Sequence, residues 1–143
     1  MRVEIHAVGR MKAGPEKELA DRFLERFAKV GPGVGLEFAG VAETPESRAR
    51  DAATRKREEG EKLRRQIGPG TMLVLLDERG RDISSQGLAE KLGSWRDNGA
   101  RTLIIAIGGA DGHDDSLYAG ADLVISFGAA TWPHQLVRIM LAE

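Results

Sequence analysis

Two short stretches of uninterrupted apolar residues constrain the fold of this chain most strongly. They are Met72–Leu76 and Leu103–Ile107, and Gly or Asp stands close to the ends of each. A membrane-spanning helix needs about 20 consecutive apolar residues, so these runs are far too short to cross a bilayer. Such runs are typical of strands that are buried on both faces of a parallel sheet.

The rest of the chain alternates between strand and helix patterns. Short apolar or alternating segments predict further strands over residues 2–8, 36–41 and 123–126. Apolar residues at three- and four-residue spacing predict helices over residues 15–30, 84–98 and 133–141. A long polar helix is expected to open at Thr44-Pro45 and to run to about Gln66 or Ile67. This alternation predicts an α/β fold, with a parallel-type sheet and helices on both of its faces.

The chain has 143 residues and no cysteine. This length suits one domain, so residues 1–143 are expected to form a single unit. Without cysteine, the chain has no disulfide scaffold, no Cys-ligated zinc or iron–sulfur site and no cysteine nucleophile. Glu4 interrupts the apolar core that a secretory signal peptide would need, so a cytoplasmic location is expected.

Familiar catalytic and phosphate-binding motifs are missing from the sequence. It has no G-x-G-x-x-G, G-x-x-x-x-G-K-[ST], H-E-x-x-H or G-x-S-x-G pattern. The segment Gly31–Gly35 is therefore expected to be only a turn. His113-Asp114-Asp115 is the one triple considered for metal binding. Polar triples in loops more often cap helices or face solvent, so no metal is expected.

Two loops rich in Gly and Ala follow apolar strands and form the candidate binding site. They are Ile107–Gly112 and Ser126–His134. In open α/β sheets, ligands bind beyond the carboxyl ends of the strands. Small residues let a ligand approach the backbone, so we expect a flat aromatic ring between the loops, with apolar walls from Leu76 and from Phe127 or Trp132. The alternative is that these loops are plain strand-to-helix connections.

The same two loops resemble the paired cofactor loops of the RlmH family. Members of that family are SPOUT-class methyltransferases that act on N3 of a pseudouridine in bacterial large-subunit (23S) ribosomal RNA. Further similarity lies in Val3–Gly9 with the following Arg10-Met-Lys12, in Glu46–Arg50 and in Leu76-Asp77, so it covers essentially the whole chain.

The resemblance implies a C-terminal trefoil knot in the α/β fold and S-adenosylmethionine as the methyl donor. It also implies a homodimer whose active sites lie at the subunit interface. With the near-zero net charge, it favours 23S rRNA in the assembled ribosome as the substrate. Carried over residue by residue, the cofactor contacts fall on Leu76, Gly108, Phe127, Gly128, Ala129, Ala130, Thr131 and Trp132.

Family members continue beyond the position of Glu143 with a tail rich in His, Tyr and Arg, which is associated with the substrate side of the site. The sequence here ends at Glu143. A second hypothesis is therefore a non-catalytic knotted module that binds the ribosome or a nucleotide and has lost turnover. A third is an unrelated α/β binding domain that binds no S-adenosylmethionine.

Methylation at N3 requires loss of the N3 proton and in-line attack on the methyl group, so the enzyme must mainly position its reactants and exclude water. His134 and Arg138 are the candidate catalytic residues, because they lie one helical turn apart near the second loop. Alternatively, His134 caps or packs the start of the helix, and Arg138 pairs with a carboxylate of the partner subunit. Asp77 and Asp111 are candidates for binding ribose hydroxyls or for capping loops.

Basic residues gather in one part of the chain, although the formal net charge is only −1. Residues 46–67 contain 8 Lys and Arg against 5 Asp and Glu, whereas residues 101–143 contain 2 against 5. RNA binding needs local positive charge to neutralise phosphates. The candidate RNA-contacting residues are therefore Arg48, Arg50, Arg55, Lys56 and Arg57. The alternative is a solvated helix face of mixed charge.

Overall fold

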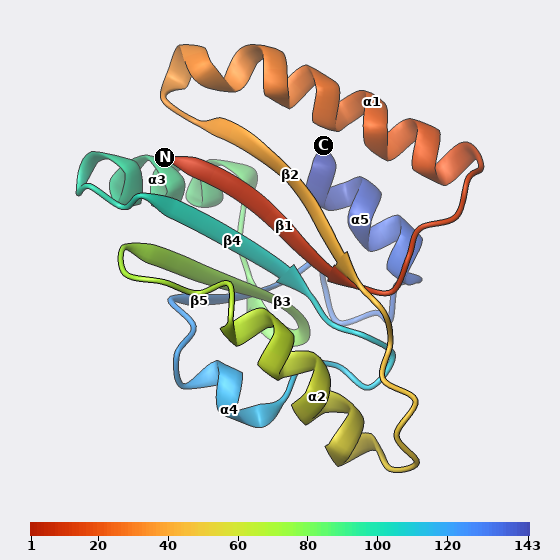
Figure 1. The fold of residues 1–143 in the computed structure, drawn as a ribbon. Coiled ribbons are helices and arrows are strands. Elements are labelled where there is room, and N and C mark those ends of the chain that lie inside the picture. Colours follow the sequence, from red (N-terminus) through yellow and green to blue (C-terminus); the bar gives the residue numbers. More distant parts are fainter.

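The computed structural model describes residues 1–143, and its centre is a five-stranded sheet in which all paired strands are parallel (Figure 1). The strand order is β2-β1-β4-β3-β5. Parallel neighbours need crossover connections, and helices supply most of them here. The strands are β1 (Arg2–Val8), β2 (Glu37–Thr44), β3 (Thr71–Asp82), β4 (Thr102–Ile107) and β5 (Leu123–Ser126).

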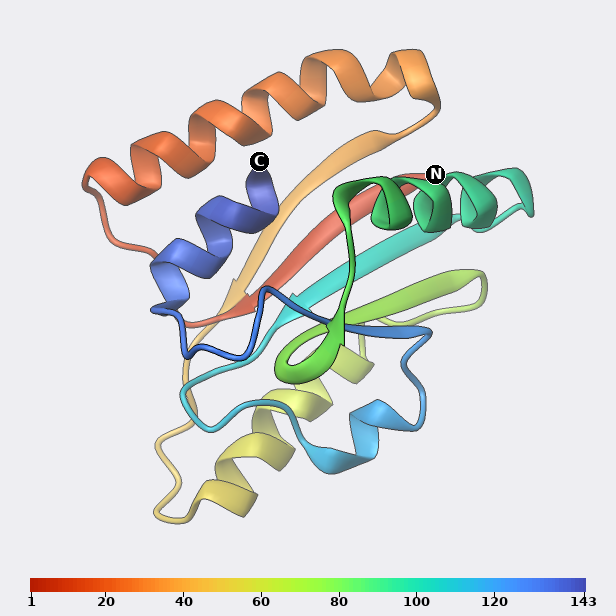
Figure 2. The same cartoon turned by 180° about the vertical axis from the view of Figure 1, so that it is seen from behind.

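Helices cover both faces of the sheet, as the sequence predicts (Figures 1 and 2). On one face lie α1 (Pro15–Val30), α3 (Ser85–Asp97) and α5 (His134–Ala142), and on the other lie α2 (Ala52–Arg64) and the short α4 (Asp115–Tyr118). The glycine-rich segment forms one 3-10 turn, η1 (Gly31–Val34), between α1 and β2. None of the helices is both long enough and apolar enough to span a membrane.

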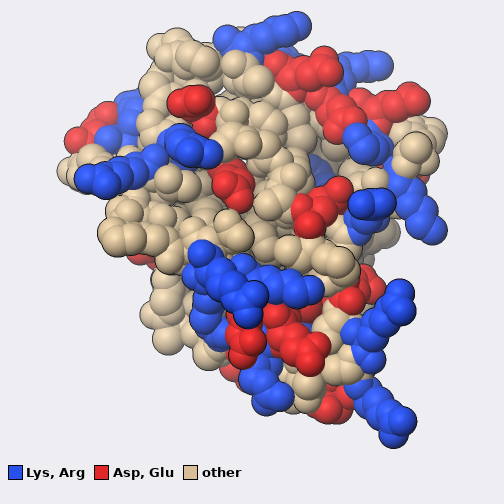
Figure 3. Space-filling model, in the orientation of Figure 1, with Lys and Arg blue, Asp and Glu red and all other residues tan.

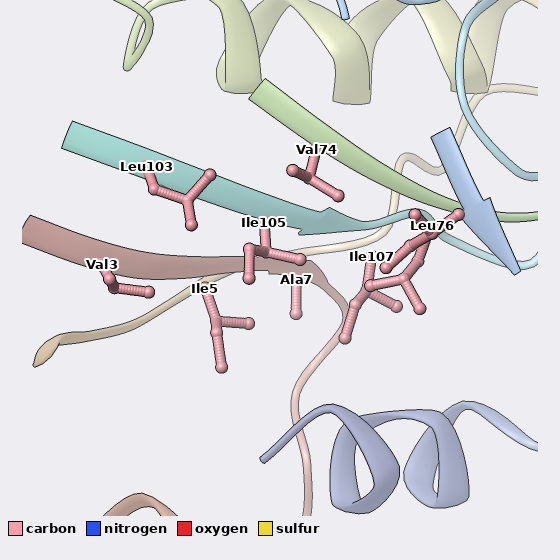
Figure 4. Close-up of a cluster of buried hydrophobic side chains, with 9 residues drawn as sticks. Val3, Ile5, Ala7, Val74, Leu76, Leu103, Ile105 and Ile107 are labelled. Atoms are coloured by element: carbon pink, nitrogen blue, oxygen red, sulfur yellow. The ribbon is translucent and has the colours of Figure 1, made fainter. Parts of the chain in front are cut away.

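The two apolar runs are uninterrupted because their side chains feed two separate cores. Val74, Leu76, Ile105 and Ile107 point into a cluster of 9 buried residues beneath α1, α3 and α5 (Figure 4). Their sequence neighbours point the opposite way and pack against α2 and α4, in a cluster formed by Leu63, Leu73, Leu75, Ile104, Ala106 and Leu117. Since successive strand residues alternate between faces, a strand covered on both faces is apolar at every position.

The predicted helix start at Thr44-Pro45 is wrong. Thr44 is still in β2, where it pairs with Val8, and its carbonyl accepts the Gly9 N–H at 2.7 Å. Helix α2 begins seven residues later, where the Asp51 carboxylate caps it by accepting the Thr54 N–H at 2.8 Å. The helix also ends at Arg64, short of the expected Gln66 or Ile67. The helix starts later than predicted because Thr44 pairs with β1 in the sheet, and this pairing is not visible in the local sequence.

Strand β3 continues well past the apolar run that predicts it. Ile125 of β5 pairs with Leu76 before a break in the ladder and with Arg81 after it. Figure 2 shows this returning segment crossing next to β5. At Gly80 the chains approach so closely that a Cβ atom would lie 2.5 Å from the carbonyl carbon of Ile125. The polar composition of residues 77–82 hides this part of the strand from a hydrophobicity pattern.

Replacing Gly80 with Ala is therefore expected to destabilise the chain by about 2 to 4 kcal/mol, because the methyl group would overlap backbone atoms that cannot rotate away. The free energy of unfolding in urea measures this. Gly68→Ala is the matched control, since its φ is not positive and nothing lies within 4 Å of its Cβ position. Equal stability of the two variants would contradict the close approach.

Candidate functional site

Three neighbouring strands are in register at one level of the sheet, and the segments that follow this level enclose a pocket. Leu76 is in register with Ile107 on one side and with Ile125 on the other, so the following residues emerge side by side. The pocket has a volume of about 490 Å³. Pockets for small molecules and cofactors are about 300–1,000 Å³. Both loops singled out in the sequence contribute to its wall.

Most of the predicted cofactor residues line this pocket. The lining includes Leu76, Gly108, Phe127, Gly128, Ala130, Thr131 and Trp132. Ala129 lies between two lining residues but is not itself part of the wall. Of the two catalytic candidates, His134 lines the pocket and Arg138 does not.

Glycine is required in the first loop by its tight geometry. The loop turns back on itself, and the Gly112 N–H donates to the Gly109 carbonyl at 3.0 Å. Gly112 has a φ of +85°, a backbone angle that residues other than glycine rarely adopt. A Cβ atom on Gly108 would lie 3.0 Å from the carbonyl carbon of Gly112. The glycines therefore set the shape of the first loop, and its Asp111 also lines the pocket.

The second loop is held by its own side chains. Ser126 Oγ accepts the Gly128 N–H at 3.0 Å, and Trp132 Nε1 donates to the Phe127 carbonyl at 3.2 Å. Thr131 Oγ1 donates to Glu78 Oε2 at 3.2 Å, which ties this loop to the one after β3. The apolar rings of Phe127 and Trp132 thus stay beside the pocket, as the sequence predicts.

Asp77 carries a fixed negative charge on the pocket wall. Its side chain is only 6% exposed, and it accepts hydrogen bonds from the Arg79 backbone N–H at 2.7 Å and from the Tyr118 hydroxyl. Burial raises the pKa of Asp77, but hydrogen bonds from Arg79 and Tyr118 outweigh it and lower the pKa to about 2. Burial, followed by the bond to Asp77, raises the pKa of Tyr118 to about 12. At neutral pH the pair is a carboxylate and a neutral phenol.

Sequence reasoning missed several polar residues of the wall. Lys56, Glu78 and Arg79 all line the pocket, and Tyr118 supports it from α4 through Asp77. The available signal was the Asp-Glu-Arg run directly after a buried strand, because polar groups at a carboxyl strand end are where open α/β sheets place ligand contacts. Tyr118 gave no local signal, since it approaches Asp77 only through the fold.

Arg138 is held by the ends of β1 and β2. Its guanidinium donates to Glu43 Oε2 at 2.5 Å and to the Gly9 carbonyl, and its side chain is 12% exposed. Burial raises the pKa of Glu43, yet hydrogen bonds from Arg138 and from the Met11 N–H lower it overall. The carboxylate that Arg138 meets belongs to the same chain, and this ion pair anchors α5 next to the pocket.

Comparison with known proteins identifies the family. The family described as predicted SPOUT methyltransferase matches residues 1–143. The chain belongs to the SPOUT methyltransferase family. It is 63% identical over 143 residues to the ribosomal RNA large subunit methyltransferase H of Mesorhizobium japonicum, covering 100% of this chain and 89% of that protein.

Two further relatives carry the same name. The Chelativorans sp. protein is 63% identical over 143 residues, which are 100% of this chain and 82% of that protein. The Rhizobium meliloti protein is 60% identical over 143 residues, again 100% of this chain, and 89% of that protein is covered. The resemblance to the RlmH family is therefore confirmed over the full length of this SPOUT-family chain.

His113, considered above for metal binding, has a structural role in this SPOUT-family chain. It is buried, and its Nε2 lies 3.0 Å from the Leu76 carbonyl, to which the neutral ring can donate. Burial lowers the pKa of His113. Its neighbour Asp114 pairs with Arg64 at 2.6 Å. No group of three or more His, Asp and Glu side chains is placed to hold a metal ion.

Some of the basic residues of α2 form ion pairs within the protein. Arg55 pairs with Asp111 and Arg64 pairs with Asp114. Figure 3 shows Lys and Arg side chains over the part of the molecule where α2 lies, with Asp and Glu side chains among them. Of the candidate RNA-contacting residues, Arg55 is thus engaged inside the protein, while Arg48, Arg50 and Arg57 make no ion pair.

The Asp77 network predicts a specific loss of stability in acid. Its pKa is lower in the folded chain than the ordinary 3.8, so its contribution is complete above that value and is lost as the pH falls toward about 2. The stability gap between the wild type and Asp77→Asn should shrink by about 1 to 2 kcal/mol over this range. Urea unfolding at pH 5 and at pH 2.5 measures it. A gap that stays constant would contradict the assigned network.

Proposed function

We propose that this chain catalyses S-adenosylmethionine-dependent methylation of N3 of a pseudouridine in 23S rRNA, in the assembled ribosome and in the cytoplasm. Membership of the SPOUT family and the names of the relatives support an rRNA methyltransferase. The observation that carries the proposal is the pocket at the ends of β3, β4 and β5, which the two predicted cofactor loops line.

The residues of the pocket fit S-adenosylmethionine. Gly108 and Gly128 leave the loop backbones open to a flat adenine ring, with Leu76, Phe127 and Trp132 as apolar walls. Three carboxylates line the pocket, and two of them, Asp77 and Asp111, are paired with Arg79 and Arg55. The third, Glu78, has no ion-pair partner, and its charge suits a positively charged sulfonium. When bound, S-adenosylmethionine supplies an electrophilic methyl group.

The chain's own residues mainly bind, orient and exclude water. A pseudouridine must lose its N3 proton, and His134 is the pocket residue proposed to accept or steer it, because its side chain lines the wall and is exposed. Arg138 is proposed to act on the site through α5, since its guanidinium is bound to Glu43 and Gly9. Positioning of this kind can supply much of the rate enhancement without a nucleophile.

The knot and the dimer are part of the same proposal. The trefoil knot is supported by the way β3 passes Ile125 twice, once at Leu76 and again at Arg81. The homodimer is supported by two exposed apolar side chains beside the pocket, Trp132 at 41% and Leu136 at 40% exposure. A second subunit would cover them and complete the walls of the site. Arg48, Arg50, Lys56 and Arg57 are the proposed RNA contacts.

Cofactor binding is the first test. Titration calorimetry with S-adenosylmethionine should show saturable binding to the wild type and about a tenfold or greater loss of affinity in Ala130→Trp, whose side chain fills the pocket. Ala13→Trp places the same ring on an exposed loop that does not line the pocket, and this variant should bind S-adenosylmethionine as the wild type does. Absence of binding by a folded wild type would contradict the proposal.

Turnover is the second test, on ribosomes that lack the modification. His134→Ala should lower kcat for methyl transfer by about a hundredfold, as expected for loss of a proton-transfer group, with the affinity for S-adenosylmethionine changed less than about threefold. Wild-type kcat in the variant would remove His134 from the chemistry. Cofactor binding without any methyl transfer by the wild type would instead favour the non-catalytic binding module.

A further inference from the structure

Helix α2 packs against the back of the first cofactor loop. Figure 2 shows the connection that leaves β4 passing alongside α2. The contact is close, because a Cβ atom on Gly109 would lie 2.9 Å from Glu59 Oε2, and one on Gly60 would lie 3.1 Å from the Asp114 Cβ. The loop that lines the pocket therefore rests on a helix that contributes only Lys56 to the pocket itself.

Arg55 makes the strongest polar link between this helix and the loop. Its Nε donates to Asp111 Oδ2 at 2.6 Å and its Nη2 donates to Asp111 Oδ1 at 3.0 Å, which is a two-pronged ion pair. Its remaining Nη1 donates to the carbonyls of Ala49 and Arg50 at 3.1 and 3.0 Å. One guanidinium thus joins the pocket loop to the segment that precedes α2.

We infer that Arg55 is a positioning residue for the cofactor pocket, which holds the Gly108–Gly112 loop in its binding conformation through Asp111. This inference rests on the proposed function. It deepens that proposal by naming a residue outside the pocket on which cofactor affinity depends.

The composition of the loop makes such a tether necessary. Gly108, Gly109 and Gly112 give the loop more conformational freedom than other residues would, and ordering it at the moment of binding would weaken affinity. Exposed ion pairs contribute little, but this one is bidentate and its side chains are only 29% and 23% exposed. Hydrogen bonds from Arg55 also lower the pKa of Asp111, so the carboxylate stays ionised at neutral pH.

The segment before α2 is held by the same helix at a second point. The Ser47 N–H donates to Glu59 Oε1 at 2.8 Å. This hydrogen bond and the two bonds from Arg55 to main-chain carbonyls together fix residues 47–50. In this segment Arg48 is exposed, and its neighbours Ser47 and Ala49 are partly buried. Arg55 therefore fixes the pocket loop relative to a main-chain segment that is itself anchored.

The first arm of the test needs no cofactor. Hydrogen exchange of the free protein reports the order of residues 108–112, whose Gly112 N–H is hydrogen-bonded to Gly109. Arg55→Met should speed exchange in this peptide by about tenfold or more, because the loop opens more often. Arg65→Met is the control, since Arg65 is exposed at the end of the same helix and makes no ion pair. Unchanged exchange in Arg55→Met would overturn the inference even if the wild type binds no cofactor.

The second arm measures affinity for S-adenosylmethionine. Arg55→Met should weaken binding by about five- to thirtyfold, and Arg55→Lys should restore little, because an ammonium cannot form the two-pronged contact. With ribosomes, KM for S-adenosylmethionine should rise while kcat at saturating cofactor stays within about twofold of the wild type. A fall in kcat with unchanged KM would contradict a role in cofactor-loop positioning.

A double-mutant cycle separates positioning from direct contact, because Asp111 itself lines the pocket. If Asp111 acts through Arg55, Asp111→Asn weakens binding about as much as Arg55→Met, and the double variant is no worse than either. Losses that multiply would overturn the inference. Failure of the wild type to bind would contradict the proposed function, whereas wild-type-like binding by Arg55→Met would contradict only the role of Arg55.

Discussion

Burial of β3 and β4 on both faces of the sheet is the interaction on which the rest of the structure depends. Val74 and Ile105 enter the core under α1, α3 and α5, while Leu75 and Ile104 enter the core under α2 and α4. A shift of one residue would exchange the two sets of side chains between faces, so the register is strongly specified. That register brings the carboxyl ends of the strands to one level, which is where the pocket forms.

The end of β3 has two roles that would otherwise need separate segments. Residues 77–80 leave the ladder and supply the acidic part of the pocket wall, and residues 81–82 return to pair with β5. Gly80 permits this because the returning chain lies directly against the backbone of Ile125. The pocket wall and the pairing with β5 therefore depend on the same short segment of chain. A substitution that loosens one is expected to disturb the other.

Sequence patterns located the parts of the fold that depend on local burial and turn chemistry. The apolar runs predicted the central strands, and the spacing of apolar residues predicted helices over residues 15–30 and 84–98, where the structure has α1 and α3. The Gly- and Ala-rich loops predicted the place of the pocket, and seven of the eight residues carried over from the RlmH resemblance line it. The RlmH resemblance supplied the family, which periodicity alone could not.

What the sequence did not show depends on contacts between distant segments. Thr44 remains in a strand because Val8 pairs with it. Arg138 lies outside the pocket lining because its guanidinium is bound by Glu43, 95 residues away. The polar end of β3 is a strand only because β5 lies beside it. Each of these is decided by tertiary pairing that overrides a local preference, as expected where propensities are weak.

A pocket formed between loops depends on where those loops lie as well as on which side chains they carry. Side-chain contacts hold each loop: Tyr118 on Asp77 holds the one after β3, and the one after β5 is held by its own Trp132, which donates to the Phe127 carbonyl. The loop after β4 is the most glycine-rich, and it has two supports, His113 on the Leu76 carbonyl and Arg55 on Asp111. Because three glycines would otherwise leave this loop free to move, its supports should matter most for affinity. Residues that never touch a ligand can therefore determine how tightly this site binds one.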